Sequence, residues 1–146
     1  MTDPAPGEGG EAARDAVDVR TDRVAQATVG VLLLAAFVFR LPWLPPILAI
    51  ALACGALAGP PANPFHWAFT TWISPRLPAA EGTVPASVVK AQDALEAVIL
   101  LVGALFYAMG LAPPAWLLTI VAAIIAIVAA TTPVHLGDEL RHVLRR

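Results

Sequence analysis

Two pairs of long apolar segments alternate with polar stretches along the chain, and this pattern predicts the fold. The second pair runs from 97 to 134 without a charged residue, and a turn at 111–114 divides it. About sixteen apolar residues on each side would span roughly 24 Å as a helix, close to a thin bilayer core. Pro113 and Pro114 end one helix and start the next, because proline suits a helix's first turn and breaks its interior. This segment predicts a transmembrane helical hairpin.

The first pair of apolar segments, at 24–58, predicts a second hairpin. Its first helix should cover 24–39, and Thr21 or Asp22 is expected to cap it. Its second helix should run from about 46 to 58. Thirteen residues is short for a membrane span, so a re-entrant hairpin remains the alternative.

Polar stretches frame the two hairpins and complete the domain organisation. Residues 1–17 are rich in Gly, Pro and Glu and lack periodicity, which is typical of a disordered tail. The rest of the chain, 18–146, is expected to form one four-helix membrane domain. In order, its parts are a hairpin at 24–58, an interfacial segment and linker at 63–86, a hairpin at 87–130 and an amphipathic segment at 133–146.

The composition supports lipid as the main solvent of the chain. Hydrophobic residues make up 58% of the sequence and charged residues only 14%, whereas a soluble domain is about a quarter charged. The net charge of -2 indicates no nucleic-acid partner. The chain has one cysteine, Cys54, so an intrachain disulfide is excluded. Cys54 lies in the middle of an apolar helix and is expected to be a packing residue in the interior. The predicted fold class is an all-α polytopic membrane protein.

The positive charges predict the orientation in the membrane. Of the nine Lys and Arg residues, only Arg40 lies at a hairpin turn. Under the positive-inside rule, both termini and the central linker are cytoplasmic, and the protein resides in the inner (plasma) membrane. Trp43 and Trp116 then mark the outer interface, while Trp67 and Trp72 mark the inner one, where short interfacial helices are expected.

The two halves of the chain are similar at a spacing of 69 residues. Eleven of 58 positions are identical between 20–77 and 89–146, although apolar composition alone supplies most of them. A parallel internal repeat about an axis along the membrane normal and chance similarity both remain open. The more specific matches are Pro45 with Pro114, His66 with His135 and Arg76 with Arg145.

Small residues four positions apart line one face of the second helix and one face of the fourth. Such faces let helix backbones approach closely in lipid, although alanine-rich composition also accounts for the pattern. The residues are Ala51, Gly55 and Gly59 in the second helix, and Ala122, Ala126 and Ala130 in the fourth.

The carboxy-terminal motif HLGDELRH is one candidate for chemistry. His135, Glu139 and His142 would share a helical face and present two imidazoles and a carboxylate to a divalent metal. His66 from the other half would supply a fourth ligand. The alternative is a solvated amphipathic helix that faces anionic headgroups and binds no cofactor.

Asp93 and Glu96 form the second candidate, a polar site at the point where the third helix enters the membrane. Ionisable groups are expensive there and often mark proton or cation paths. Structural pairing with Arg20 or Arg23 is the alternative. Asp138, in the carboxy-terminal motif, completes this candidate polar site.

Several of these features together resemble the domain of unknown function 4395 family. They are the collar DVRTDR at 18–23, the two short hairpins, the linker SPRLPA at 74–79 and the compact motif after the last span. The resemblance covers about 18–141 and implies a small bacterial integral membrane protein of no established activity. Many members carry a Cys-x-x-Cys pair where this chain has His135 and Asp138. Thiol chemistry is therefore not expected here.

The sequence leaves three functional hypotheses. No phosphate loop, nucleophile elbow or HExxH motif is present, which favours a non-enzymatic membrane component. It would self-associate as a homo-oligomer or anchor a cytoplasmic protein partner through the segments around His66 and His135. The second hypothesis is a small transporter or channel subunit that acts as an oligomer, with Glu96 and the histidines along a polar path. The third is a metal-dependent membrane enzyme.

Overall fold

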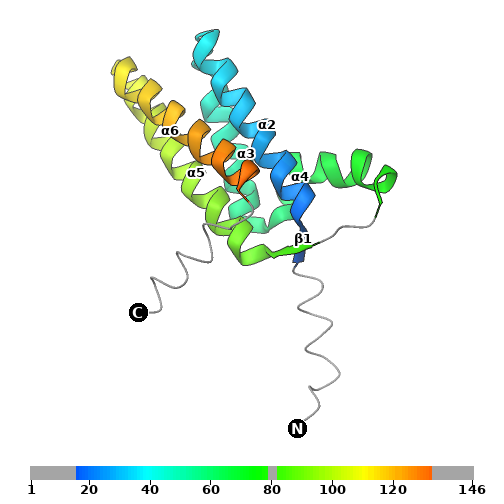
Figure 1. Cartoon of the computed structure of the whole chain (residues 1–146). Helices are drawn as coiled ribbons and strands as arrows, with labels where there is room; N and C mark the ends of the chain where they lie inside the picture. The colour runs from blue at the N-terminus through cyan, green and yellow to red at the C-terminus, as the bar shows by residue number, and fades with distance from the viewer. Residues whose placement is uncertain (1–15, 79–81, 133–146) are drawn as a thin grey trace.

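Four long helices form a bundle in the computed structural model, which describes residues 16–78 and 82–132 (Figure 1). The bundle confirms the all-α fold class. The turns of the two hairpins, at 39–43 and 109–111, lie at the same end of the bundle, which is the upper end in Figure 1. The helices are α2 (Val19–Val38), α3 (Leu44–Ala58), α5 (Ala86–Ala108) and α6 (Ala112–Thr131).

Helix α2 begins earlier than the sequence predicts, and this difference matters for the site. Its cap is Asp18, whose side chain accepts a hydrogen bond from the backbone N–H of Arg20 at 2.8 Å. The prediction that Thr21 or Asp22 caps the helix is therefore wrong. Because α2 gains its first turn, both of these side chains lie on its buried face.

The two hairpin turns are built alike. Each leaves a helix through a residue with positive φ, Arg40 (53°) in the first turn and Gly110 (79°) in the second. Proline then occupies the first positions of α3 and of α6. A fixed φ near −65° and no need for an N–H partner make proline suitable at those positions. The prolines therefore place the turns where the sequence predicts them.

Two short strands, which the sequence analysis does not predict, join the beginnings of α2 and α5. β1 (Ala16–Asp18) pairs antiparallel with β2 (Thr83–Pro85), and Val17 lies opposite Val84. Val84 is fully buried and packs with two valines in the first turn of α5. The pairing holds the start of α2 beside the start of α5.

The helices pack across the two hairpins more than within the first one. Helix α2 lies against α6, α3 lies against α5, and α5 also contacts α6. Small side chains permit this contact: a Cβ added at Gly30 would lie 2.7 Å from Cγ1 of Ile127. The buried core consists of Val29, Leu33, Leu48, Ala49, Leu52, Ala97, Leu100, Ala122, Ala123 and Ala126.

A chain of short turns connects α3 to the second strand and extends sideways from the bundle (Figure 1). Asn63 caps α4 by accepting a hydrogen bond from the N–H of Phe65 at 3.0 Å. Further along, Trp67 and Trp72 make an edge-to-face contact with ring centroids 5.7 Å apart. The turns are η1 (Pro60–Ala62), α4 (Pro64–Ala68), the π-helical η2 (Phe69–Ile73) and η3 (Ser74–Arg76).

The outer surface of the bundle is apolar. Leu57, Val38 and Leu117 are 85%, 69% and 61% exposed. Within the described ranges, α2 and α6 are long and apolar enough to cross a membrane by length and composition, and α3 is apolar but shorter. Cys54 is exposed on this surface, so the expectation that it packs in the interior is wrong.

Candidate functional site

Polar side chains gather inside the bundle, at the end opposite the two hairpin turns. Eight polar or charged residues are buried among those described, and all but Thr119 come from α2, the η1–α4 segment or α5. Six of them form what we call the polar cluster. Its members are Asp22 and Gln26 of α2, Asn63 and His66 of the η1–α4 segment, and Asp93 and Glu96 of α5.

Asp93 is held between the η1–α4 segment and α3. Nδ2 of Asn63 donates a hydrogen bond to Oδ2 of Asp93 at 2.9 Å, while Oδ1 is buried without a hydrogen-bond partner. The carboxylate reaches this position because Gly55 leaves room for it. A Cβ added at Gly55 would overlap Oδ2 of Asp93 and lie 2.8 Å from Cβ of Asn63.

Glu96 lies between α5 and α2 and is fully buried. Nε2 of Gln92, one turn earlier, donates to Oε1 of Glu96 at 3.3 Å. In the amide orientation that satisfies both groups, Gln26 donates to the same oxygen at 3.0 Å. Two amides therefore hold the carboxylate, and no ion pair reaches Glu96 or Asp93 from the described part of the chain.

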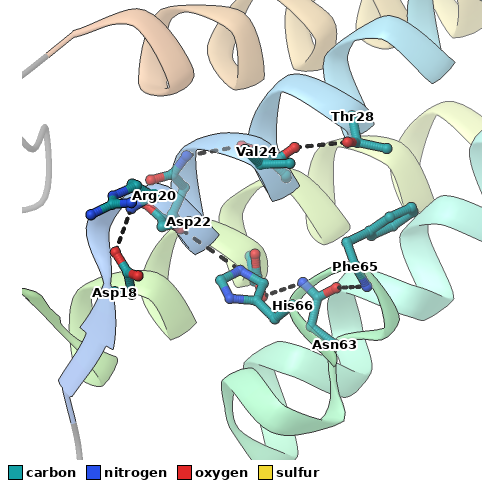
Figure 2. Close-up of polar contacts among 11 residues, drawn as sticks. Asp18, Arg20, Asp22, Val24, Thr28, Asn63, Phe65 and His66 are labelled. Carbon is teal, nitrogen blue, oxygen red and sulfur yellow. Dashed lines mark hydrogen bonds and ion pairs between the residues drawn. The ribbon is translucent and has the colours of Figure 1, made fainter. Parts of the chain in front are cut away.

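His66 points from α4 toward Asp22 of α2 (Figure 2). Its Nε2 lies 3.8 Å from Oδ1 of Asp22, and only 2% of the histidine is exposed. Burial lowers the pKa of His66 from 6.5 to about 4, because the low-dielectric surroundings disfavour the imidazolium. The imidazole is therefore neutral at pH 7. Neither ring nitrogen has a hydrogen-bond partner among the described residues.

A cavity of about 480 Å³ lies beside the polar cluster. Its wall combines β1, the end of α3, the α4–η3 segment and the first turns of α5. Polar lining comes from Asp18, Thr21, His66, Thr70, Ser74 and Lys90. His66 thus belongs both to the cavity wall and to the cluster.

The structure brings three of the candidate site residues into one buried region. Asp93 and Glu96 lie in the polar cluster together with His66, but their partners are amides and not the expected Arg20 or Arg23. The remaining candidates, His135, Asp138, Glu139 and His142, lie outside the described residues. The metal-site prediction that depends on them therefore stays a prediction. Within 16–78 and 82–132, no group of three His, Cys, Asp or Glu side chains could hold a metal ion.

The expected interfacial tryptophans lie in two groups. Trp116 makes edge-to-face contacts with Phe37 and Tyr107, each at 5.9 Å between ring centroids. Trp43, in the first hairpin turn, is 57% exposed at the same end of the bundle. The pair formed by Trp67 and Trp72 belongs to the opposite end, beside the cavity.

Sequence reasoning missed three members of the cluster, namely Asp22, Gln26 and Asn63. One signal in the sequence could have found two of them. Asp22 and Gln26 are four residues apart and continue the face on which Val29 and Leu33 are buried. Polar residues in line with a core face are expected to be buried with partners.

A comparison with family models decides the classification. The model described as Domain of unknown function (DUF4395) matches residues 17–146. The chain belongs to this family. The match includes all but the first residue of β1, all four long helices and the whole polar cluster. No curated protein and no solved structure shows significant similarity to the chain.

Proposed function

We propose that this protein is a small integral membrane protein whose polar cluster carries protons, acting as a transporter subunit within an oligomer. The observation that carries the proposal is the burial of Asp93 and Glu96, each 0% exposed, inside a bundle whose outer surface is apolar. Soluble proteins have the opposite arrangement of polar and apolar side chains. The membrane location and the proton transport are supported by separate observations.

The outer surface supports the membrane location. Exposed large apolar side chains cover all four long helices, whereas a soluble monomer rarely exposes an apolar patch above a few hundred Å². Half of the ten core residues are alanines, such as Ala49, Ala123 and Ala126, and the others are leucines and a valine. Close packing of small residues, with large side chains directed outward, is typical of helices that associate in lipid.

The unusual chemistry of the cluster supports proton transport. An ionised carboxylate is expensive to bury unless a cation or a proton compensates it. Amides and not cations hold Asp93 and Glu96 in the described structure. Proton binding is the compensation that this arrangement favours, because a protonated carboxyl group carries no charge and can still accept a hydrogen bond from an amide.

We also propose four membrane segments, with the cluster near the cytoplasmic side. Helix α3 has 15 residues and would span roughly 22 Å. It packs beside α5, the helix that carries Glu96, so it is assigned to the membrane with the other three. The positive-inside rule then places the hairpin turns outside and the α4–η3 segment at the inner interface.

An internal repeat is part of the same proposal, and the burial pattern supports it. Every buried position of α2 except Ala25 has a buried counterpart in α5 at a spacing of 67 residues. Gln26 thus corresponds to Asp93, and Val29 corresponds to Glu96. The burial pattern of α2 and α5 favours a spacing of 67 residues, whereas sequence identity over the two halves favours 69. A repeat would therefore require that the segments between corresponding helices differ in length by a few residues.

The anchor hypothesis stays a prediction. It assigns the segment around His66 to a cytoplasmic partner, but this imidazole is 2% exposed and faces the bundle. The exposed part of that segment is Trp67 and Trp72, at 51% and 62%. These side chains suit the headgroup region of a bilayer.

The test is proton flux in liposomes that contain the purified protein and a pH-sensitive dye. A proton gradient should collapse faster with wild-type protein than with Glu96→Gln, which keeps the shape of the side chain and cannot ionise. Glu11→Gln, the same chemical change outside the described residues, is the matched control and should behave as wild type. Equal flux for wild type and Glu96→Gln would overturn the proposal.

A further inference from the structure

His66 is the one titratable residue of the described chain that is shared by the polar cluster and the cavity wall. The carboxylates of the cluster are enclosed by helices, with Asp22 5%, Asp93 0% and Glu96 0% exposed. The cavity, by contrast, is large enough for several water molecules. Like the polar cluster, it lies at the end of the bundle opposite the hairpin turns. A proton that travels between the cavity and the carboxylates meets His66 on the way.

The local structure holds His66 firmly at this position. Asn63 caps α4 through its side-chain oxygen and donates a hydrogen bond to Asp93 through its side-chain nitrogen. It therefore holds the start of α4, the helix that carries His66, next to Asp93 of α5. The hydroxyl of Thr70 donates to the backbone oxygen of His66 at 2.9 Å. The ring itself makes no hydrogen bond within the described chain. The backbone is therefore fixed, while no hydrogen bond within the described chain ties the imidazole to one partner.

We propose that His66 relays protons between the cavity and the carboxylates of the polar cluster. This inference rests on the proposed proton transport and names the route by which the cluster is reached. In the inward step, the ring turns its unprotonated nitrogen toward the cavity, and a hydronium ion there gives this nitrogen a proton and remains as water. The proton on the other ring nitrogen passes to the carboxylate of Asp22. One proton enters, one leaves, and a rotation of the ring restores the original tautomer.

The distance between the partners is suited to such a relay. The 3.8 Å from Nε2 of His66 to Oδ1 of Asp22 is about 0.6 Å longer than the upper end of the usual N–H···O range. A small rotation of the ring closes this gap, and the opposite rotation reopens it. A permanent, short ion pair would instead trap the proton between the two residues.

The charged groups around His66 agree with a neutral relay. On the side that faces the bundle, His66 lies against Asp22 of α2. Asp93 of α5 is hydrogen-bonded to Asn63 in the same region. On the cavity side, Asp18 of β1 and Lys90 of α5 carry opposite charges. Because burial lowers the pKa of His66 to about 4, one ring nitrogen is available to accept a proton at pH 7.

Chemical rescue tests this role. His66→Ala would remove the ring and enlarge a cavity that already measures about 480 Å³, so free imidazole can occupy the vacated position. Flux in liposomes should fall on the order of a hundredfold or more, as expected when a positioned proton-transfer group is lost. Added imidazole should restore flux in proportion to its concentration. Imidazole also crosses membranes by itself, so rates are compared with Glu96→Gln liposomes that receive the same imidazole.

His66→Gln is the second variant, because it fills the space of the ring but cannot pass a proton. We expect the same loss of flux and no rescue by imidazole. Wild-type flux in His66→Gln, or a folded His66→Ala protein with slow flux that imidazole does not restore, would overturn the relay. Failure of the proposed function looks different: wild-type protein itself would then show no flux that depends on Glu96.

Discussion

Gly55 is the position where a single added carbon should disrupt the polar cluster. A Cβ at this position of α3 would overlap Oδ2 of Asp93 and lie 2.8 Å from Cβ of Asn63. Both neighbours are buried, and they are joined by the 2.9 Å hydrogen bond between Asn63 and Asp93. The carboxylate therefore cannot move aside without losing its partner.

The expected cost of Gly55→Ala follows from three contributions. Overpacking of a buried site costs about 1 to 3 kcal/mol. Loss of the hydrogen bond between Asn63 and Asp93 leaves a buried polar group without a partner, which costs about 1 to 3 kcal/mol. The higher helix propensity of alanine returns about 1 kcal/mol. Gly55→Ala should therefore lower the free energy of unfolding by about 1 to 5 kcal/mol.

Equilibrium unfolding in mixed detergent micelles, followed by tryptophan fluorescence, measures this change. Gly103→Ala in α5 is the matched control, because its Cβ would meet the oxygen of Ala115 at 3.4 Å and Cβ of Leu118 at 3.5 Å. These are ordinary contacts, so the control should be neutral or stabilised by up to about 1 kcal/mol. In an Asp93→Ala background, Gly55→Ala should cost clearly less than in the wild type.

The reasoning would be refuted if Gly55→Ala were as stable as Gly103→Ala. It would also fail if the cost of Gly55→Ala were the same with and without the carboxylate of Asp93. Either result would mean that Asp93 does not lie against the backbone of α3.

Three further predictions concern other parts of the molecule. Asn63→Leu leaves Oδ2 of Asp93 buried without a donor and should cost about 2 to 3 kcal/mol in the same unfolding assay, whereas Asn63→Gln should recover part of this loss. Acidification should destabilise the protein through His66: the unfolded side chain binds a proton near pH 6.5 and the folded one near pH 4, so the unfolded state takes up more protons between these values. Thermal unfolding at pH 7 and pH 4.5 should show a loss of up to about 3 kcal/mol that His66→Gln reduces, and an equal loss in both proteins would contradict the buried neutral imidazole. Cys54 is exposed on the apolar surface, so in intact membranes it should not react with a charged maleimide until detergent and denaturant bring it into water, because the thiolate is the reactive form; rapid labelling in intact membranes would place it in water.

The long helices could be predicted because their signals are local. Apolar runs set their extent, and prolines at the first positions of α3 and α6 set the turns. The strands could not be predicted in this way. β1 and β2 have three residues each, and they form only because 16–18 and 83–85 are brought together by the bundle.

The candidate site was predictable only in part, for a similar reason. Asp93 and Glu96 were found because charges beside an apolar run are conspicuous. Asp22 was assigned to a cap, since a polar residue before a helix usually has that role. Because Asp18 is the cap, α2 begins about a turn closer to the N-terminus than predicted, and Asp22 lies on its buried face. The partners of these carboxylates come from other helices, and sequence spacing does not reveal such contacts.

Infrared spectroscopy of the protein in lipid membranes tests the central claim most directly, because the C=O stretch of a protonated carboxyl group is resolved from other bands. The account predicts a carboxyl band that changes with pH, shifts in D₂O and is lost in Glu96→Gln but retained in Glu11→Gln. A spectrum without such a band, or one that Glu96→Gln leaves unchanged, would contradict a proton-exchanging cluster inside the membrane.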